Sequence, residues 1–309
     1  MHHPTRNSIT KLLAALVTTA GLALADVVWV TAPGGTTVRA EIRQTSAFRV
    51  RSFDVTTRDG SPPDPAVVSA LREEIAGTFT DVTAALQRKP VRVTSVTTRV
   101  KQTPGQEPVL VSTVERPGLT ATTFQQVVRA DGRLDTTFVS GRTPKSIVSS
   151  YSNGGRIDLL TDMPSVYHRD LTAGDAWELP RAFVPLGLPF EYLAFKRPAE
   201  LQPNVGSQSR VTFRGRDERG RAVFELTQTG VLAEWAQTGA MLPSRDLAGL
   251  PVTRRGLVRY RPDGLLDGYE LSVTVTSREE GDRDVGGRAY HWVMELDAVS
   301  TDTCTTGTP

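Results

Sequence analysis

His168 and its neighbours are the first place where this sequence could hold catalytic chemistry. Ser165, His168 and Asp170 supply the three side-chain types of a hydrolytic triad within a short segment. Triad members are normally oriented by separate parts of a fold, so such a local cluster is not the usual arrangement. We therefore interpret His168 as a loop histidine. A hydrolase of unrecognised type that uses His168, Asp263 or Asp267 is kept as an alternative.

The other patterns that carry catalytic, cofactor or metal chemistry are missing from the chain. The sequence has no G-x-S-x-G nucleophile elbow, no H-E-x-x-H zinc motif, no P-loop and no G-x-G-x-x-G fingerprint. His291 shares a predicted strand face with Glu295, but His168 is too remote in sequence to suggest a zinc site with them. We predict no catalytic residue, no metal site and no cofactor, and we class the chain as not an enzyme.

A seven-residue pattern, R-x-D-G-x-L-D, occurs at residues 129–135 and again at 261–267. Each copy lies between strand-like runs, and Asp-Gly in that position is a hairpin signal. Acidic turns can also bind calcium, but a calcium loop presents more oxygen ligands at closer spacing. The same alternatives, a cation loop or a solvated turn, apply to Asp282 and Asp284. We favour hairpins at all these places, and the repeat favours two similar β lobes.

Aromatic residues are concentrated among prolines in the segment that follows Gly174. Apolar side chains in such a setting can line a ligand groove. We predict that the groove is lined by Trp177, Phe190, Tyr192 and Phe195. The alternative is that these residues form the core and the edge covering of a sheet.

The run Ala173-Gly174-Asp175-Ala176-Trp177 precedes a hairpin-rich stretch that contains an Asp-Gly turn. In this respect the C-terminal part of the chain resembles exported bacterial proteins of unknown function. Those proteins have long-stranded, curved antiparallel sheets similar to the half-barrels of the lipoprotein-carrier type. The resemblance implies an exported, sheet-rich protein with an apolar concave face. It transfers no functional residue, because members of the group have no assigned catalytic site.

Much of the chain alternates between apolar and polar residues with the period of two that is typical of a half-buried strand. Phe48 and Val50 alternate with arginines, whereas Phe53 falls on the opposite parity, so we expect a β-bulge near Ser52. Strands are predicted at 38–43, 48–55, 91–101, 108–115, 120–129, 133–140, 211–213, 222–226, 271–275 and 290–296.

One segment has the period of a helix instead. Asp64 can cap a helix and Pro65 suits its first position. An apolar stripe at spacings of three and four residues then predicts a helix over 65–88, ending before Pro90. Its members are Val68, Leu71, Ile75, Phe79, Val82 and Leu86. Gly77 and several threonines weaken this helix, so we expect it to pack on a sheet.

The N-terminal segment has the form of a cleaved secretory signal. Arg6 and Lys11 precede an apolar run at 12–25, and Ala23-Leu24-Ala25 fits the small-x-small cleavage pattern. The run is shorter than a membrane span requires, and no later stretch is long and apolar enough to cross a bilayer as a helix. We therefore expect residues 1–25 to be removed and the mature chain to have no transmembrane segment.

Charge and cysteine content limit the partners of the mature chain. The whole sequence has a net charge of +2, and removal of the signal lowers its 36 basic residues to 34, against 34 acidic ones. This balance gives no support to nucleic-acid binding. Cys304 is the single cysteine, so an intrachain disulfide is excluded.

Together these features predict a mainly β fold with minor α, made of antiparallel curved sheets with one amphipathic helix on the N-terminal sheet. The expected divisions are a signal at 1–25, an N-terminal lobe at 26–150 with the helix at 65–88, a C-terminal lobe at 151–299 and a flexible tail at 300–309. The expected function is that of a noncatalytic, exported envelope or periplasmic protein that binds a lipid, another apolar ligand or an envelope component. A structural or assembly module that acts through protein contacts is an alternative.

Overall fold

The computed structural model describes residues 26–88, 92–115, 117–118, 120–141, 157–158, 163–178, 183–184, 199–202, 208–232 and 249–307. The expected signal segment, residues 1–25, lies outside this part of the chain.

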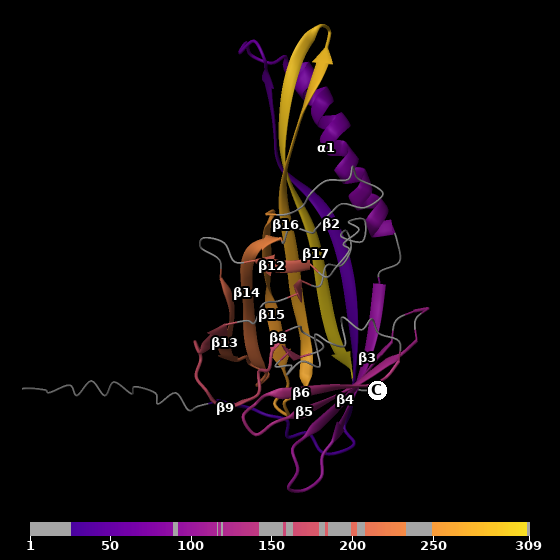
Figure 1. Ribbon diagram of the computed structural model, residues 1–309, viewed down its shortest axis with the longest axis vertical. Coiled ribbons are helices and arrows are strands. Elements are labelled where there is room, and N and C mark those ends of the chain that lie inside the picture. Colours follow the sequence, from indigo (N-terminus) through magenta and orange to yellow (C-terminus); the bar gives the residue numbers. More distant parts are fainter. Residues whose placement is uncertain are drawn as a thin grey trace, which may run out of the picture.

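An open antiparallel sheet of 13 strands dominates the fold (Figure 1). The main path through the sheet runs, in order, through β10 (Ala176–Glu178), β13 (Ser209–Arg216), β14 (Ala222–Leu232), β15 (Pro251–Tyr260), β16 (Leu266–Val285), β17 (Arg288–Gly307), β2 (Thr37–Thr57), β3 (Arg92–Lys101), β4 (Val109–Glu115), β5 (Thr122–Val128) and β6 (Leu134–Ser140). Two further strands lie off this path: β12 (Ala199–Gln202) pairs with β14, and β11 (Phe183–Val184) pairs with β12. The prediction of a mainly β, antiparallel fold with one helix is confirmed for the described residues.

Three long strands, β16, β17 and β2, form the centre of the sheet and carry the helix. Figure 1 shows α1 (Pro65–Arg88) beside their upper part, and β3 to β6 fanned across their lower end. The predicted bulge is present, because Glu295 pairs with Ser52 whereas the next residue, Leu296, pairs with Val50. The extra residue moves Phe53 onto the same face as Val50, where the helix packs.

The helix has the predicted bounds and the predicted cap. The Asp64 side chain accepts a hydrogen bond from the Ala66 N–H at 2.8 Å, as an N-cap aspartate does. Leu71 is buried against Phe53 and Met294 of the sheet. Several other members of the predicted stripe are only half-buried: Val68, Ile75, Phe79 and Val82.

The expected flexible tail at 300–309 is wrong for its described part, 300–307. These residues are the C-terminal part of β17, a strand that pairs with β16 on one side and with β2 on the other. Ser300, for example, lies between Val273 and Ser46. Cys304 is buried there. The segment is rich in serine and threonine, which suggests a loop, but it pairs with β2 along its whole described length and with β16 as far as Thr305.

The sheet runs without a break across the proposed boundary between the lobes. Strands β2 to β6 of the expected N-terminal lobe and β13 to β17 of the expected C-terminal lobe join where β2 pairs with β17. The expected lobes are therefore two halves of one sheet.

The two copies of the R-x-D-G-x-L-D pattern form equivalent hairpin turns. The Arg129 N–H donates to the Arg133 carbonyl at 2.8 Å, and the Arg261 N–H donates to the Leu265 carbonyl at 2.8 Å. Each turn aspartate accepts a hydrogen bond from a backbone N–H two residues later. The predicted hairpins are confirmed. The turn at 217–221 has the same backbone hydrogen bonds without the full sequence pattern.

Two segments fill the lower end of the curved sheet, and we call them the inner segments: residues 26–32, which include β1 (Asp26–Val28), and residues 165–171, which include β9 (His168–Leu171). β1 and β9 pair with each other, and the short strands β7 (Ile157–Asp158) and β8 (Met163–Pro164) form a separate pair. Tyr167 of the inner segments donates its hydroxyl hydrogen to the carbonyl of Gly264 at 3.2 Å. The inner segments belong to one apolar cluster with residues from both halves of the sheet, so the sheet curves around them.

Candidate functional site

The face of the sheet that contacts both α1 and the inner segments is called the inner face here. It carries two separate apolar clusters. One lies at the lower end around Tyr167, Phe224 and Tyr260. The other lies under α1 around Phe53 and Met294. The middle of the inner face, between these clusters, is where the candidate site lies.

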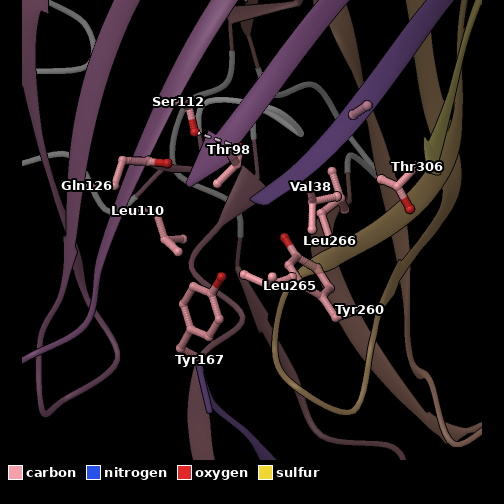
Figure 2. Close-up of a pocket in the computed structure, with 11 residues that line it drawn as sticks. Val38, Thr98, Leu110, Ser112, Gln126, Tyr167, Tyr260, Leu265, Leu266 and Thr306 are labelled. Atoms are coloured by element: carbon pink, nitrogen blue, oxygen red, sulfur yellow. Dashed lines mark hydrogen bonds between the residues drawn. The ribbon is translucent and has the colours of Figure 1, made fainter. Parts of the chain in front are cut away.

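A small, partly open cavity lies within the lower cluster (Figure 2). Its volume of about 30 Å³ has room for about two water molecules. Polar groups are available to such waters, among them the hydroxyls of Thr98 and Ser112, which are hydrogen-bonded to each other at 2.9 Å. The lining residues are Val38, Ala40, Thr98, Leu110, Ser112, Gln126, Tyr167, Tyr260, Leu265, Leu266 and Thr306. The cavity is too small for a lipid chain and is best interpreted as a water site.

Trp177 is the one predicted ligand residue that the structure describes. Phe190, Tyr192 and Phe195 lie outside the described residues. Trp177 is half-buried on β10, and its ring centroid is 5.0 Å from that of His168 and 6.0 Å from that of Phe224. Its Nε1 atom is buried without a hydrogen-bond partner. Burial beside this ring lowers the pKa of His168, although Asp170 and Asp175 act in the opposite direction.

Strand pairing aligns a line of polar residues across the middle of the inner face. Ser209 pairs with Gln228, and Gln228 pairs with Arg254. Arg254 pairs with Val273, which in turn pairs with Ser300. Ser300 pairs with Ser46. We call Ser209, Gln228, Arg254, Ser300 and Ser46 the polar row.

The three central members of the polar row are deeply buried, which is unusual for such residues, whereas Ser46 and Ser209 are half-buried. Gln228 and Ser300 are each 3% exposed and Arg254 is 1% exposed. Three of its side-chain atoms are buried without a hydrogen-bond partner: Gln228 Oε1, Ser300 Oγ and Ser46 Oγ. Leaving such a group unpaired costs about 1–3 kcal/mol, so native proteins have few of them and each one calls for an explanation. Here they lie together on one face.

Apolar residues flank the polar row on both sides. One step toward the helix, the paired positions are Val252, Val275, Ala298 and Phe48. One step toward the inner segments, the paired positions are apolar from Trp177 to Leu271 (Trp177, Val211, Leu226 and Leu271), but on β17 and β2 they are Asp302 and Gln44, which are hydrogen-bonded to each other at 2.8 Å. The middle of the inner face is therefore amphipathic, with hydrogen-bonding groups beside an apolar row on the helix side and a row on the other side that is apolar from β10 to β16.

The structure does not assemble the residues of the alternative catalytic hypothesis. The Ser165 hydroxyl donates to the backbone carbonyl of Gly132, so it is not poised beside His168. Asp263 accepts hydrogen bonds from Arg261 and from the Leu265 N–H. Asp267 accepts one from Arg221 at 2.9 Å. Each carboxylate is thus engaged with its own turn or a neighbouring strand.

The charged tip of the hairpin that β16 and β17 form is also internally paired. Asp282 accepts hydrogen bonds from His291 at 3.0 Å and from Arg58 at 2.7 Å, and these lower its pKa. Within the described residues, no three histidine, cysteine or acidic side chains group closely enough to hold a metal ion. The solvated-turn interpretation is favoured over a cation loop.

Sequence reasoning missed the polar row. Gln228 and Arg254 fall on the same parity as apolar residues of their strands, and a polar residue at an apolar position was the available signal. Alternation along one strand does not reveal which residues of other strands lie beside it.

The chain was compared with known proteins. No family model matches it, and no curated protein matches it. A solved structure, described as the InvG secretin domain β-barrel from the Salmonella SPI-1 injectisome NC-base, aligns at 7% identity and a TM-score of 0.15. The alignment covers 88% of this chain but 61% of that structure. This likeness is too low to carry an argument about fold or function. In the described residues, α1 is not apolar enough to span a membrane.

Proposed function

We propose that this chain is a noncatalytic, exported envelope or periplasmic protein that binds an amphipathic ligand, an apolar molecule with one polar group, on its inner face. The observation that carries the proposal is a set of buried atoms without partners: Gln228 Oε1, Ser300 Oγ and Ser46 Oγ of the polar row, and Trp177 Nε1 of the row beside it. A ligand's polar group would supply the missing hydrogen bonds, and its apolar part would contact the flanking rows.

The small cavity at the lower end supports placing the ligand at the polar row. That cavity has space for about two water molecules, which is far less than an alkyl chain occupies. The lower cluster is a packed core around Tyr167. Ligand binding is therefore assigned to the middle of the inner face, next to the predicted ligand residue Trp177.

The experiment is a binding titration on the mature chain, residues 26–309, with a single-chain amphiphile, followed by indole fluorescence. The expected result is a saturable change that is lost in Trp177→Phe and kept in Trp292→Phe. Trp292 is a suitable control because it stacks on Phe53 under the helix, with ring centroids 6.1 Å apart. Mass spectrometry of an extract of the purified protein provides a second test. No saturable binding together with no co-purified amphiphile would rule the proposal out.

An assembly role is the second candidate, and the edge strand β6 favours it. Its residues 136–140 carry no charge, and Val139 is 55% exposed. Uncharged edges are open to pairing with another strand, whereas the free edge of β16 is protected by charged residues such as Arg278 and Asp282. Crosslinking from a probe at Val139 in the native envelope tests this role; strand-specific adducts support it, and their absence counts against it.

A further inference from the structure

The regular part of β6, Leu134–Phe138, pairs with β5 along one of its edges. At the start of this hairpin the Arg129 N–H donates to the Arg133 carbonyl at 2.8 Å, so these two residues form a hydrogen-bonded pair. Hydrogen-bonded and non-hydrogen-bonded pairs alternate along an antiparallel ladder, so Asp135 and Thr137 direct their backbone N–H and C=O groups to β5. The residues that direct theirs to the other edge are Leu134, Thr136 and Phe138. In the described part of the chain, no strand pairs with β6 along that other edge.

Two features fix the ends of this outward edge. The hairpin turn at 129–133 comes immediately before Leu134. A β-bulge comes immediately after Phe138, because Val139 is an extra residue that pairs with no residue of β5. A further strand can therefore pair regularly only with the stretch from Leu134 to Phe138, whose midpoint is Thr136.

Charge distinguishes the outward edge of β6 from the other long edges of the described sheet. The upper part of β16 pairs with no described strand on the β15 side, and it carries Arg278 and Asp282 there. The upper part of β2 likewise extends beyond its pairing with β3 and carries Arg49. Charged side chains on an edge discourage pairing with another chain. The regular part of β6 has a single charged residue, Asp135, and that residue is paired with Arg129.

We propose that the partner in the assembly role is a second copy of this chain, bound by antiparallel pairing of β6 with β6 so that Thr136 lies opposite the partner's Thr136. This register covers the whole regular stretch and pairs Leu134 with the partner's Phe138. It gives about six backbone hydrogen bonds, two for each of the three outward residues. It also places Asp135 opposite the partner's Thr137, so no two like charges face each other.

The symmetry of this pairing limits the assembly to a dimer. A two-fold axis at Thr136 uses the same edge of both copies, so the contact closes on itself and does not continue into a filament. A contact made by one short strand from each copy is small, so the dimer is weak and depends on concentration. The inference rests on the assembly role proposed above and goes beyond it by naming the partner and the register.

The test is sedimentation velocity on a chain of residues 26–309 between about 10 and about 500 µM, a range suited to weak contacts. We expect a reversible shift from monomer to dimer. In the proposed register, the Cβ atom of Thr137 lies about 5 Å from that of the partner's Asp135. Asp135 and Glu107 share one cation, Arg129, so this cluster keeps a net negative charge.

Substitutions of opposite charge at Thr137 test the register. Thr137→Asp should weaken the dimer about fivefold or more, because the two-fold axis then sets two pairs of like charges opposite each other. Thr137→Lys should dimerise at least as tightly as the wild type, because the new charge faces the acidic cluster. If any charge on the edge simply blocked pairing, both variants would lose the dimer. Thr45→Asp and Thr45→Lys are matched controls, because Thr45 is an exposed threonine in the centre of the sheet; both should dimerise like the wild type.

Amide hydrogen exchange of the wild type provides a readout that needs no substitution. The N–H groups of Thr136 and Phe138 should exchange more slowly at high protein concentration, because the second copy then accepts their hydrogen bonds. The N–H of Thr137 is directed to β5 in monomer and dimer alike, so its exchange should not depend on concentration. This measurement decides the question if a Thr137 variant does not fold.

The outcomes separate the two proposals. If the wild type stays monomeric while the probe at Val139 gives strand-specific adducts with another protein, the second-copy inference is wrong and the assembly role stands. If a dimer forms but Thr137→Asp and Thr137→Lys weaken it alike, or the exchange of Thr136 does not depend on concentration, the inference is also wrong. If the wild type stays monomeric and the Val139 probe gives no adducts, the assembly role itself fails.

Discussion

Replacing Gly264 by alanine tests whether the repeated hairpin turns hold the inner segments in place. Gly264 has a φ of +81°, and a Cβ built on it would lie 2.1 Å from the Trp29 carbonyl oxygen. Gly220 occupies the same position of the turn with the same backbone hydrogen bonds and a φ of +71°. A Cβ on Gly220 would meet nothing closer than Pro262 Cγ at 3.7 Å. Comparing Gly264→Ala with Gly220→Ala therefore separates the cost of backbone strain, which both share, from the cost of steric overlap, which only Gly264→Ala has.

The structure sets the expected difference between these two substitutions. Both place an L-residue in the left-handed region, which costs about 1–2 kcal/mol. Only Gly264→Ala also forces the backbone of Trp29 to move by roughly 1 Å, and such overpacking costs a further ~1–3 kcal/mol. The movement also disturbs the hydrogen bond that the Thr31 N–H donates to the Asp263 carbonyl at 3.0 Å. We expect losses of about 1.5 kcal/mol for Gly220→Ala and about 3–4 kcal/mol for Gly264→Ala.

The assay is urea unfolding of a chain of residues 26–309, followed by circular dichroism, with the m-value checked for each variant. In thermal unfolding the same difference corresponds to about 2–4 °C per kcal/mol for a chain of this size. Gly132→Ala should behave like Gly264→Ala, because its Cβ would lie 1.9 Å from the Tyr167 carbonyl oxygen. A Gly264→Ala variant within about 0.5 kcal/mol of Gly220→Ala would refute the idea that the turns clamp the inner segments.

Three further predictions concern single side chains. Tyr167→Phe should lower the free energy of unfolding by about 1 kcal/mol, since it removes the hydroxyl that donates to Gly264; an unchanged urea midpoint would show that this hydrogen bond contributes nothing. Leu71→Ala should cost about 2–3 kcal/mol by leaving a cavity between α1 and the sheet, measured by urea unfolding; a loss below about 1 kcal/mol would mean that α1 is not packed there. In an NMR titration, His168 should take up its proton below the usual pKa of 6.5, because burial disfavours its charged form. The folded state then binds fewer protons than the unfolded state near that pH, so stability should fall as pH drops through this range, and His168→Gln should flatten that part of the pH profile. A His168 titration at or above 6.5 would contradict the burial argument.

The pairing at the hairpin tip gives a prediction in the acid range. Hydrogen bonds from His291 and Arg58 lower the pKa of Asp282, so Asp282 stabilises the fold above its unfolded pKa. That contribution disappears as pH falls through the folded pKa. Asp282→Asn should therefore destabilise the chain at neutral pH, and the difference from the wild type should shrink as pH falls through the lowered pKa of Asp282, as measured by urea midpoints across the pH range. Equal urea midpoints for Asp282→Asn and the wild type at neutral pH would show that the charged contacts of Asp282 do not contribute to stability.

Much of the fold was predictable because it follows from local patterns. The helix begins and ends where Asp64, Pro65 and the apolar stripe indicate, and the strand at Phe48 shows its bulge in the change of parity. The hairpin turns at Asp131 and Asp263 were predictable for the same reason, since an Asp-Gly turn is set by a few adjacent residues.

The flexible-tail prediction failed where local composition and tertiary pairing disagree. Residues 300–307 are polar enough to suggest a loose end, but they form the inner part of a long central strand. Residues 300–305 pair on both sides, with β16 and with β2, and residues 306–307 pair with β2. Sequence separation hides this, because Ser300 and Ser46 are adjacent only once the strands pair.

By itself the sequence determined the strand and helix periods, the turn positions and the absence of familiar catalytic motifs, all of which depend on residues within a few positions of one another. The tertiary structure alone decided that the expected lobes share one sheet and that Gln228, Arg254, Ser300 and Ser46 form a single row. The physical reason is register. Each strand fixes which of its own residues face inward, but only pairing between distant strands decides which polar residues become neighbours and which of their atoms are left without a partner.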